Sequence, residues 1–252
     1  MVNVGAGNDS HSSSRAERVR SMFSDIAPTY DLLNSLLSLG VDGRWRRRAA
    51  ELALAGGGAE PRVLDVATGT GNLAFALKRR AERGTVTGVD FAEPMLAVAR
   101  SKAERLGLEV EFAVADGTAL PYPDASFDAV TIGYGLRNFA DVDAGLREFR
   151  RVLAPGGVCV VLEFPPPPKG VFGAAFAFYF RRVLPLIGGL ISGKRSAYTY
   201  LPESVLAFLE PASLAERMTQ AGFTDVRYEL QTFGVSAVHV GRVPRSVSAG
   251  SA

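Results

Sequence analysis

The chain has 252 residues, enough for one large domain or two small ones, and 47% of them are hydrophobic, as in globular proteins with a sizeable core. Its 28 basic and 26 acidic side chains leave a net charge of +2, which gives no indication of a nucleic-acid partner. One cysteine and two histidines exclude an internal disulfide and a Cys/His metal cluster.

Both ends of the chain are small and polar. The N-terminal stretch has no apolar segment typical of a secretory signal, so we expect a cytoplasmic protein. We expect disordered tails at 1–14 and 244–252, because neither contains enough apolar residues to order it. Residues 15–243 are then predicted to form a single domain.

The first part of this domain, residues 15–55, is predicted to be helical. Apolar residues recur at helical spacing before Gly40, which ends the first helices. A further helix is predicted from Arg44 to Leu54. The basic run Arg44–Arg48 is interpreted as its solvated face rather than a binding patch.

Residues 61–164 alternate between strand and helix patterns. Strands are predicted at 62–66, 85–90, 110–114, 127–132 and 158–164, and helices at 72–83, 94–106 and 142–153. After an insertion at 165–203, helices at 204–208 and 211–221 and strands at 226–230 and 235–240 close the domain. This order predicts an α/β fold, a doubly wound and mostly parallel sheet of seven strands.

The insertion contains the one candidate for a membrane span. Residues 170–180 and 183–193 are uncharged, but Arg181 and Arg182 separate them. Each run is shorter than the ~20 residues that a span requires, and two arginines at its centre would be costly. We therefore expect a soluble protein, with contact to a membrane surface left open.

The first predicted strand leads into a glycine loop. Gly69-x-Gly71-x-x-Ala74 matches the nucleotide-binding fingerprint of doubly wound folds, although glycines after a strand can also form a simple tight turn. Asp90 ends the second strand, where a carboxylate can accept hydrogen bonds from ribose hydroxyls. These features predict a ligand that contains adenosine.

Two further acidic residues narrow the prediction. Asp65 ends the first strand, where a carboxylate would repel a dinucleotide's phosphates and favour a ligand with an ammonium group. Asp116, followed by Gly117, ends the third strand, where it can accept from an adenine amino group. Each alone could be a helix cap or turn residue. Together the three acids are expected to form an acidic rim that favours S-adenosylmethionine over NAD.

The sequence resembles the class I S-adenosylmethionine-dependent methyltransferases, and more narrowly the menaquinone and ubiquinone C-methyltransferases, over about residues 18–243. The resemblance rests on these motifs: Met22-Phe23, Tyr30-Asp31-x-x-Asn34, Leu39-Gly40, Val63-Leu64-Asp65, Gly69-Thr70-Gly71, Asp116-Gly117 with Ala119-Leu120-Pro121-Tyr122, Phe127-Asp128-Ala129-Val130-Thr131, Gly135-Leu136-Arg137-Asn138, Leu162-Glu163-Phe164, Tyr198-x-Tyr200-Leu201-x-Glu203-Ser204 and Ala237-Val238-His239-x-Gly241.

The resemblance implies a Rossmann-like class I fold and a set of cofactor-binding residues, and it implies no metal. That set is Asp65, Gly69, Thr70, Gly71, Asp90, Asp116, Gly117 and Gly133. The chain departs from the pattern at two positions. Gly133 stands where many relatives have serine, and Asn72 stands where aspartate is common.

The resemblance also implies the chemistry. A methyl group moves from the sulfonium to a ring carbon of a prenylated hydroquinone, demethylmenaquinol or a ubiquinone precursor. The carbon becomes nucleophilic when a phenolic proton leaves, so the oxyanion requires stabilisation. Arg137 is expected to hold the phenolate or to position a water that takes the proton, because it cannot act as a literal base. Asn138 would orient the ring oxygen or cap the cofactor. Tyr30, with Asp31 and Asn34, would close the site from above, although an ordinary aromatic contact is the alternative for Tyr30.

Aromatic and basic residues of the insertion suit a lipophilic substrate. Those expected to line an entry for the prenyl tail are Phe172, Phe176, Phe178, Tyr179 and Phe180, and those expected to meet anionic lipid are Arg181, Arg182, Lys194 and Arg195. The alternative is a plain core helix. His239, in the last strand, is expected to have a structural role.

Three other functions remain open at this point. The chain could methylate a different small molecule, such as a sterol, an arsenical or a phenol. It could bind the cofactor without catalysis. A nicotinamide-dependent enzyme is a third alternative, and Asp65 argues against it.

Overall fold

The computed structural model of the protein describes residues 21, 24, 31, 38, 40–167, 170–179, 182 and 195–245. Several expectations fall outside these residues. They are the N-terminal tail, nearly all of the C-terminal tail, Tyr30 and Asn34 in the first helices, and Phe180, Arg181 and Lys194 in the insertion.

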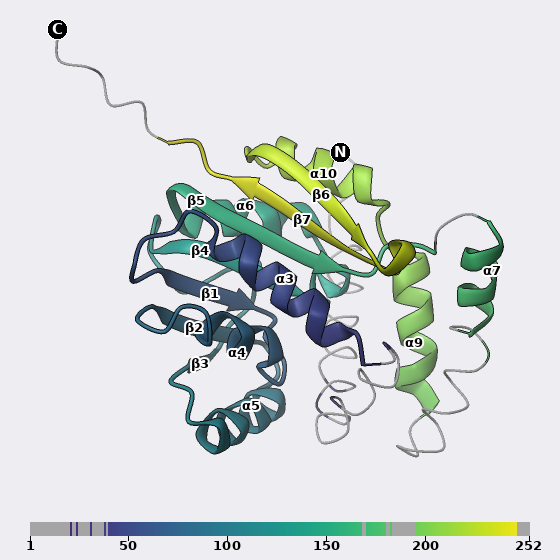
Figure 1. The fold of residues 1–252 in the computed structure, drawn as a ribbon, viewed down its shortest axis with the longest axis horizontal. Helices are drawn as coiled ribbons and strands as arrows, with labels where there is room; N and C mark the ends of the chain where they lie inside the picture. The colour runs from purple at the N-terminus through teal and green to yellow at the C-terminus, as the bar shows by residue number, and fades with distance from the viewer. Residues whose placement is uncertain are drawn as a thin grey trace, which may run out of the picture.

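Seven strands form one sheet in the order β3-β2-β1-β4-β5-β7-β6 (Figure 1). Their bounds are β1 Arg62–Val66, β2 Thr85–Asp90, β3 Glu111–Val114, β4 Phe127–Gly133, β5 Leu153–Glu163, β6 Thr224–Gln231 and β7 Ser236–Arg242. β1 to β5 pair in parallel, and β7 is antiparallel to both of its neighbours. The predicted doubly wound, mostly parallel fold is confirmed.

The central strands are apolar on both faces because helices cover both sides of the sheet. In β5, Val158, Val160 and Leu162 pack into one core, whereas Cys159 and Val161 pack into the other. α3 (Asp42–Leu54) and α4 (Asn72–Lys78) supply helical residues to the first core. α6 (Val142–Val152) and α10 (Pro211–Gln220) supply helical residues to the second core, which lies behind the sheet in Figure 1.

Element ends differ from prediction where the local pattern is interrupted. α4 ends at Lys78 rather than at 83, and α5 (Glu93–Leu106) runs beside β2 and β3. β5 begins at Leu153 rather than at 158, because residues 153–157 belong to the strand, and its register against β4 shifts between Phe127 and Ala129.

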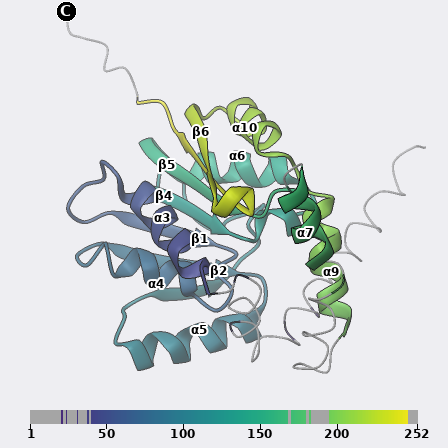
Figure 2. The same ribbon diagram turned by 45° about the vertical axis from the view of Figure 1, so that its right-hand side comes forward.

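Two helices lie beyond the carboxyl ends of the parallel strands, α7 (Val171–Phe178) and α9 (Arg195–Leu206) (Figures 1 and 2). α9 starts nine residues before the helix predicted at 204–208 and continues through Pro202. A proline there removes a backbone hydrogen bond, but Pro202, Ser204 and Val205 are buried, so packing holds the helix. Among the described residues, no helix has the length and apolarity needed to cross a membrane.

Candidate functional site

The predicted site lies at the edge where β1, β2 and β4 end together, as expected for a doubly wound sheet. The loop after β1 has left-handed backbone at Gly69 (φ 57°) and Gly71 (φ 85°). A Cβ atom on Gly71 would lie 2.7 Å from the Phe75 ring. Glycine is therefore required at Gly71 both for its backbone angle and for the close packing of α4.

Asp65 lies beneath this loop and is fully buried. Its two carboxylate oxygens accept hydrogen bonds from the hydroxyls of Thr68 (2.6 Å) and Thr131 (2.7 Å). Burial raises the pKa of Asp65 to about 6, although both hydroxyls and Arg46 act in the opposite direction. Asp65 thus forms the floor of the site, not the exposed rim that the sequence suggested.

Asp90 anchors the glycine loop from β2. Its carboxylate accepts from the backbone N–H of Gly69 at 2.8 Å and of Ala92 at 2.9 Å. Burial raises its pKa, and these backbone hydrogen bonds lower it in part. A carboxylate has about four acceptor positions, so Asp90 retains capacity for further donors.

Asp116 and Gly117 follow β3 and differ in their surroundings from the first two acids. Asp116 is exposed, and one of its oxygens accepts from both the backbone N–H and the hydroxyl of Thr118 (2.8 and 2.7 Å). Gly117 is buried, and a Cβ there would lie 2.4 Å from Phe139 and 2.8 Å from Val66. The three acids therefore differ in burial and partners, and they do not form one continuous acidic rim.

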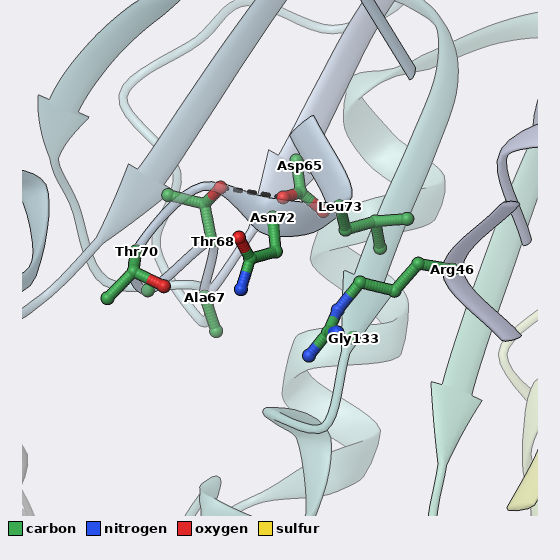
Figure 3. A pocket seen from close by; sticks show the side chains of 9 residues that line it. Arg46, Asp65, Ala67, Thr68, Thr70, Asn72, Leu73 and Gly133 are labelled. Carbon is green, nitrogen blue, oxygen red and sulfur yellow. Dashed lines mark hydrogen bonds between the residues drawn. The ribbon is translucent and has the colours of Figure 1, made fainter. Parts of the chain in front are cut away.

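Two pockets meet at this edge and share Ala67, Gly69 and Gly133. The first pocket is lined by Arg46, Asp65, Ala67, Thr68, Gly69, Thr70, Asn72, Leu73 and Gly133 (Figure 3). The second pocket is lined by Ala67, Gly69, Asp90, Phe91, Met95, Gly133, Tyr134, Gly135 and Asn138. Five of the predicted cofactor residues, Asp65, Gly69, Thr70, Asp90 and Gly133, line one or both pockets, whereas Gly71, Asp116 and Gly117 line neither.

Arg137 lies in the short helix η1 (Leu136–Asn138), directly after β4. Its side chain is almost fully buried, and its Nη1 donates to Glu163 at 2.7 Å and to the Tyr134 carbonyl. The guanidinium also lies over the Phe164 ring, 5.9 Å from its centre. The buried Nε has no hydrogen-bond partner among the described residues.

The neighbouring positions connect η1 to the rest of the site. The side-chain oxygen of Asn138 accepts from the Tyr200 hydroxyl at 3.0 Å, which joins η1 to α9. Gly135 has φ −111°, an angle that does not require glycine. Glycine is required there for space, because a Cβ would lie 2.6 Å from that of Ala67. Tyr134 adopts a positive φ, at 60°.

The model of the ubiE/COQ5 methyltransferase family matches residues 11–243 of this chain. The chain belongs to this family. A demethylmenaquinone methyltransferase from Thermus thermophilus is 64% identical over 223 residues, 88% of this chain and all of the relative. One from Deinococcus radiodurans is 56% identical over 227 residues, 90% of this chain and 93% of that protein.

Solved structures support the fold of this ubiE/COQ5 family member. A SAM-dependent methyltransferase from Aquifex aeolicus superposes with a TM-score of 0.55 at 20% identity, covering 77% of this chain and 89% of the other. At this identity the likeness shows the fold alone.

Sequence reasoning missed the charged residue of the methyltransferase's first pocket that lies outside the glycine loop and the strands, Arg46. The predicted solvated face holds for Arg44 and Arg47, which are exposed, but is wrong for Arg46, which is only 8% exposed. Figure 3 shows its side chain reaching from α3 toward the pocket. Arg46, Ala50 and Ala53 form a buried stripe at helical spacing, and this spacing was the available signal.

A second feature joins the N-terminal region to the glycine loop through Asp31, whose partners the sequence did not indicate. Asp31 accepts from Thr70 (2.6 Å), Asn72 (2.8 Å) and Lys102 (2.6 Å), and Lys102 also donates to the Asn72 carbonyl at 2.6 Å. Burial raises the pKa of Asp31, but the hydrogen bonds from Lys102, Thr70 and Asn72 outweigh it and lower the pKa overall. Asn72 thus donates through its amide nitrogen and accepts through its amide oxygen.

His239 has the expected structural position. It is buried in β7, and its Nε2 lies 2.9 Å from the Pro211 carbonyl of α10. Burial lowers its pKa. Among the described residues, no group of three or more His, Cys, Asp or Glu side chains is placed to hold a metal ion.

Proposed function

We propose that this methyltransferase moves the methyl group of S-adenosylmethionine to a ring carbon of a prenylated demethylmenaquinol, giving menaquinol. The observation that supports this most is the pairing of the two pockets with the Arg137–Asn138 segment at one edge of the sheet. The names of the two relatives, with 56–64% identity over nearly the whole chain, support the substrate class.

The second pocket suits the adenosine end of the methyl donor. Asp90 offers carboxylate lone pairs to ribose hydroxyls, and Phe91 and Met95 offer apolar surface to a purine ring. Gly69, Gly71 and Gly133 allow close approach of a ligand to the backbone. The bound donor supplies an electrophilic methyl group. Asp116 and Gly117 are proposed to contact the adenine from the adjoining loop.

The acceptor is proposed to meet Arg137. A phenol ordinarily has a pKa near 10, so a fixed positive charge beside its oxygen favours loss of the proton and raises the electron density of the ring. A buried N–H without a partner is unfavourable, and the Nε of Arg137 has none among the described residues. It can donate to the phenolate oxygen or to a water that takes the proton.

The remaining catalytic residues are proposed to position the acceptor. Asn138 is fixed by the Tyr200 hydroxyl, which leaves its amide N–H₂ to orient a ring oxygen. Tyr30, one residue before Asp31 in sequence, is proposed to close the site above the acceptor. Thr70 is proposed to hold the loop against the cofactor through its hydrogen bond to Asp31.

The prenyl tail is proposed to enter beside α7, with reversible contact to the cytoplasmic face of a membrane. The Phe178 side chain at the end of α7 is 66% exposed, and Arg182, just beyond it, is exposed as well. Phe176 instead packs against the core, so α7 is partly a core helix. A hydrophobic side chain beside a basic one is a combination that suits an anionic lipid surface.

Methyl transfer by the purified chain tests the function. The enzyme is incubated with methyl-labelled S-adenosylmethionine and either a short-chain demethylmenaquinol or the corresponding benzoquinol precursor. We expect label in the naphthoquinol ring. Label only in the benzoquinol would assign the alternative substrate. Tight cofactor binding with no transfer to either would indicate a binding module, and tight binding of NADH would reject the proposed donor.

A further inference from the structure

The first pocket contains one cationic side chain among the described residues that line it, Arg46. Two contacts hold its guanidinium, and a third interaction holds one of its partners. Asp42, one turn earlier in α3, forms an ion pair with its Nη1, and the Ser38 hydroxyl donates to the same Asp42 at 2.8 Å. The Tyr134 ring lies under the guanidinium, 5.6 Å from its carbon to the ring centre.

A buried cation that lines a pocket needs anionic groups around it. Asp42 supplies one from behind, and Asp65 supplies another from the pocket floor, where both of its oxygens already accept from threonine hydroxyls. Asp31 and Lys102, which hold the glycine loop at Thr70 and Asn72, neutralise each other at 2.6 Å. Asp42 does not line this pocket, and Asp65 already accepts from two hydroxyls. The guanidinium has five N–H donors and pairs with Asp42 through Nη1, so it borders a space suited to a small anion.

We propose that Arg46 binds the α-carboxylate at the amino-acid end of the methyl donor. This inference rests on the proposed function for the donor's identity. The two pockets share Ala67, Gly69 and Gly133 and therefore adjoin each other. A ligand with its adenosine in the second pocket extends past these three residues into the first pocket. There the carboxylate meets Arg46, and the ammonium group lies toward the acceptor groups of the pocket floor.

Three ligands separate this role from a structural one. S-adenosylhomocysteine has the complete amino-acid end. 5′-(3-Aminopropylthio)adenosine keeps the amino group and lacks the carboxylate, and 5′-methylthioadenosine lacks both. Calorimetry measures the affinity of each for the wild type, Arg46→Gln, Arg46→Lys and Arg47→Gln. Arg47 is the matched control because it is the exposed neighbour in the same helix.

Arg46→Gln should weaken S-adenosylhomocysteine about 10–100-fold, the effect of losing a charged hydrogen-bonded pair. It should leave the two ligands without a carboxylate within about threefold of the wild type. Arg46→Lys should recover part of the loss, because a point charge replaces a planar fork. Arg47→Gln should bind all three normally.

Equal weakening of all three ligands by Arg46→Gln would mean that Arg46 only shapes the pocket, and the proposal would fail. Unchanged affinity for S-adenosylhomocysteine would also overturn it. Because binding of the two truncated ligands requires a folded second pocket, these results are interpretable even if the variant is less stable. A wild type that binds none of the three would reject the proposed donor as well, so the two failures are distinguishable.

Discussion

Arg137 and Glu163 form an ion pair at 2.7 Å in which both side chains are almost completely buried, 4% and 2% exposed. Glu163 also accepts from the backbone N–H of Phe164 at 2.9 Å and of Arg137 at 3.3 Å. The pair therefore fastens η1 to the end of β5. A residue proposed to stabilise the acceptor's charge is at the same time part of the core, and experiments on it must separate the two roles.

Arg137→Met should reduce the free energy of unfolding by about 3–5 kcal/mol, because it leaves the Glu163 carboxylate buried without its cation. The double variant Arg137→Met, Glu163→Gln should lose less, since no uncompensated charge remains. Urea denaturation of both variants and of Glu163→Gln measures this. Additive losses in the double variant would show that the two side chains do not depend on each other.

Arg137→Lys keeps a positive charge and is the better variant for catalysis. We expect single-turnover methyl transfer to fall by up to about 10²–10³-fold at saturating cofactor, the effect of removing one oxyanion donor. Affinity for S-adenosylmethionine should stay near that of the wild type. Arg217→Lys, which alters an exposed ion pair with Asp143, is the control. Turnover within about twofold of the wild type would move the catalytic role elsewhere, with Tyr30 the next candidate.

Gly135→Ala should destabilise the fold by about 1–3 kcal/mol, because the new Cβ atom would overlap that of Ala67. The cause is steric, so Ala67→Gly should restore stability in the double variant. Ala67 has φ 51°, so glycine there also relieves backbone strain. Gly58→Ala should be close to neutral, because its new Cβ atom would have nothing within 4 Å. Thermal melts of the four variants compare these effects, and failure of Ala67→Gly to rescue would contradict the steric explanation.

Asp65→Asn should change how stability depends on pH. Burial raises the pKa of Asp65 from its ordinary value of 3.8 to about 6, so the folded state binds the proton more tightly than the unfolded state. The stability that this tighter proton binding gives the folded state is complete below the pKa of the unfolded state. It is lost as the pH rises through the pKa of the folded state. Between pH ~4 and pH ~7 the variant should therefore gain about 3 kcal/mol relative to the wild type.

Asp128→Asn is the control of opposite sign for this pH dependence. Burial raises the pKa of Asp128, but the hydrogen bonds from Arg62 outweigh it and lower the pKa overall. Its stabilising contribution is present above the unfolded pKa and is lost as the pH falls. Urea denaturation across the pH range should show the two variants diverging from the wild type in opposite directions. Parallel curves for Asp65→Asn and the wild type would contradict a raised pKa.

Phe178→Ser combined with Arg182→Glu should reduce flotation of the protein with anionic vesicles. Burial of one phenylalanine contributes roughly 1.5–3 kcal/mol, and the lost positive charge should make the remaining binding less sensitive to salt. Leu106→Ser is the control, because Leu106 is 44% exposed at the far end of α5. Equal flotation of all three proteins would exclude this surface as a membrane contact.

The sequence by itself determined the order and nature of most elements and the position of the site. The strands 62–66 and 85–90 were predicted to the residue, because a run of apolar residues bounded by turn signals is a local property. The glycine loop and Asp90 could be placed together for the same reason, since parallel strands bring their carboxyl ends to one edge.

Only the tertiary structure decided how the charges of the site are paired. Arg137 and Glu163 are 26 residues apart, and Asp31 and Lys102 are 71 apart. Arg46 appears in the sequence as one of four neighbouring arginines and in the fold as a wall of the first pocket. Whether a side chain is solvated or buried depends on which groups pack against it. Residues distant in the chain provide those groups, and they do so only after the sheet and its helices have assembled.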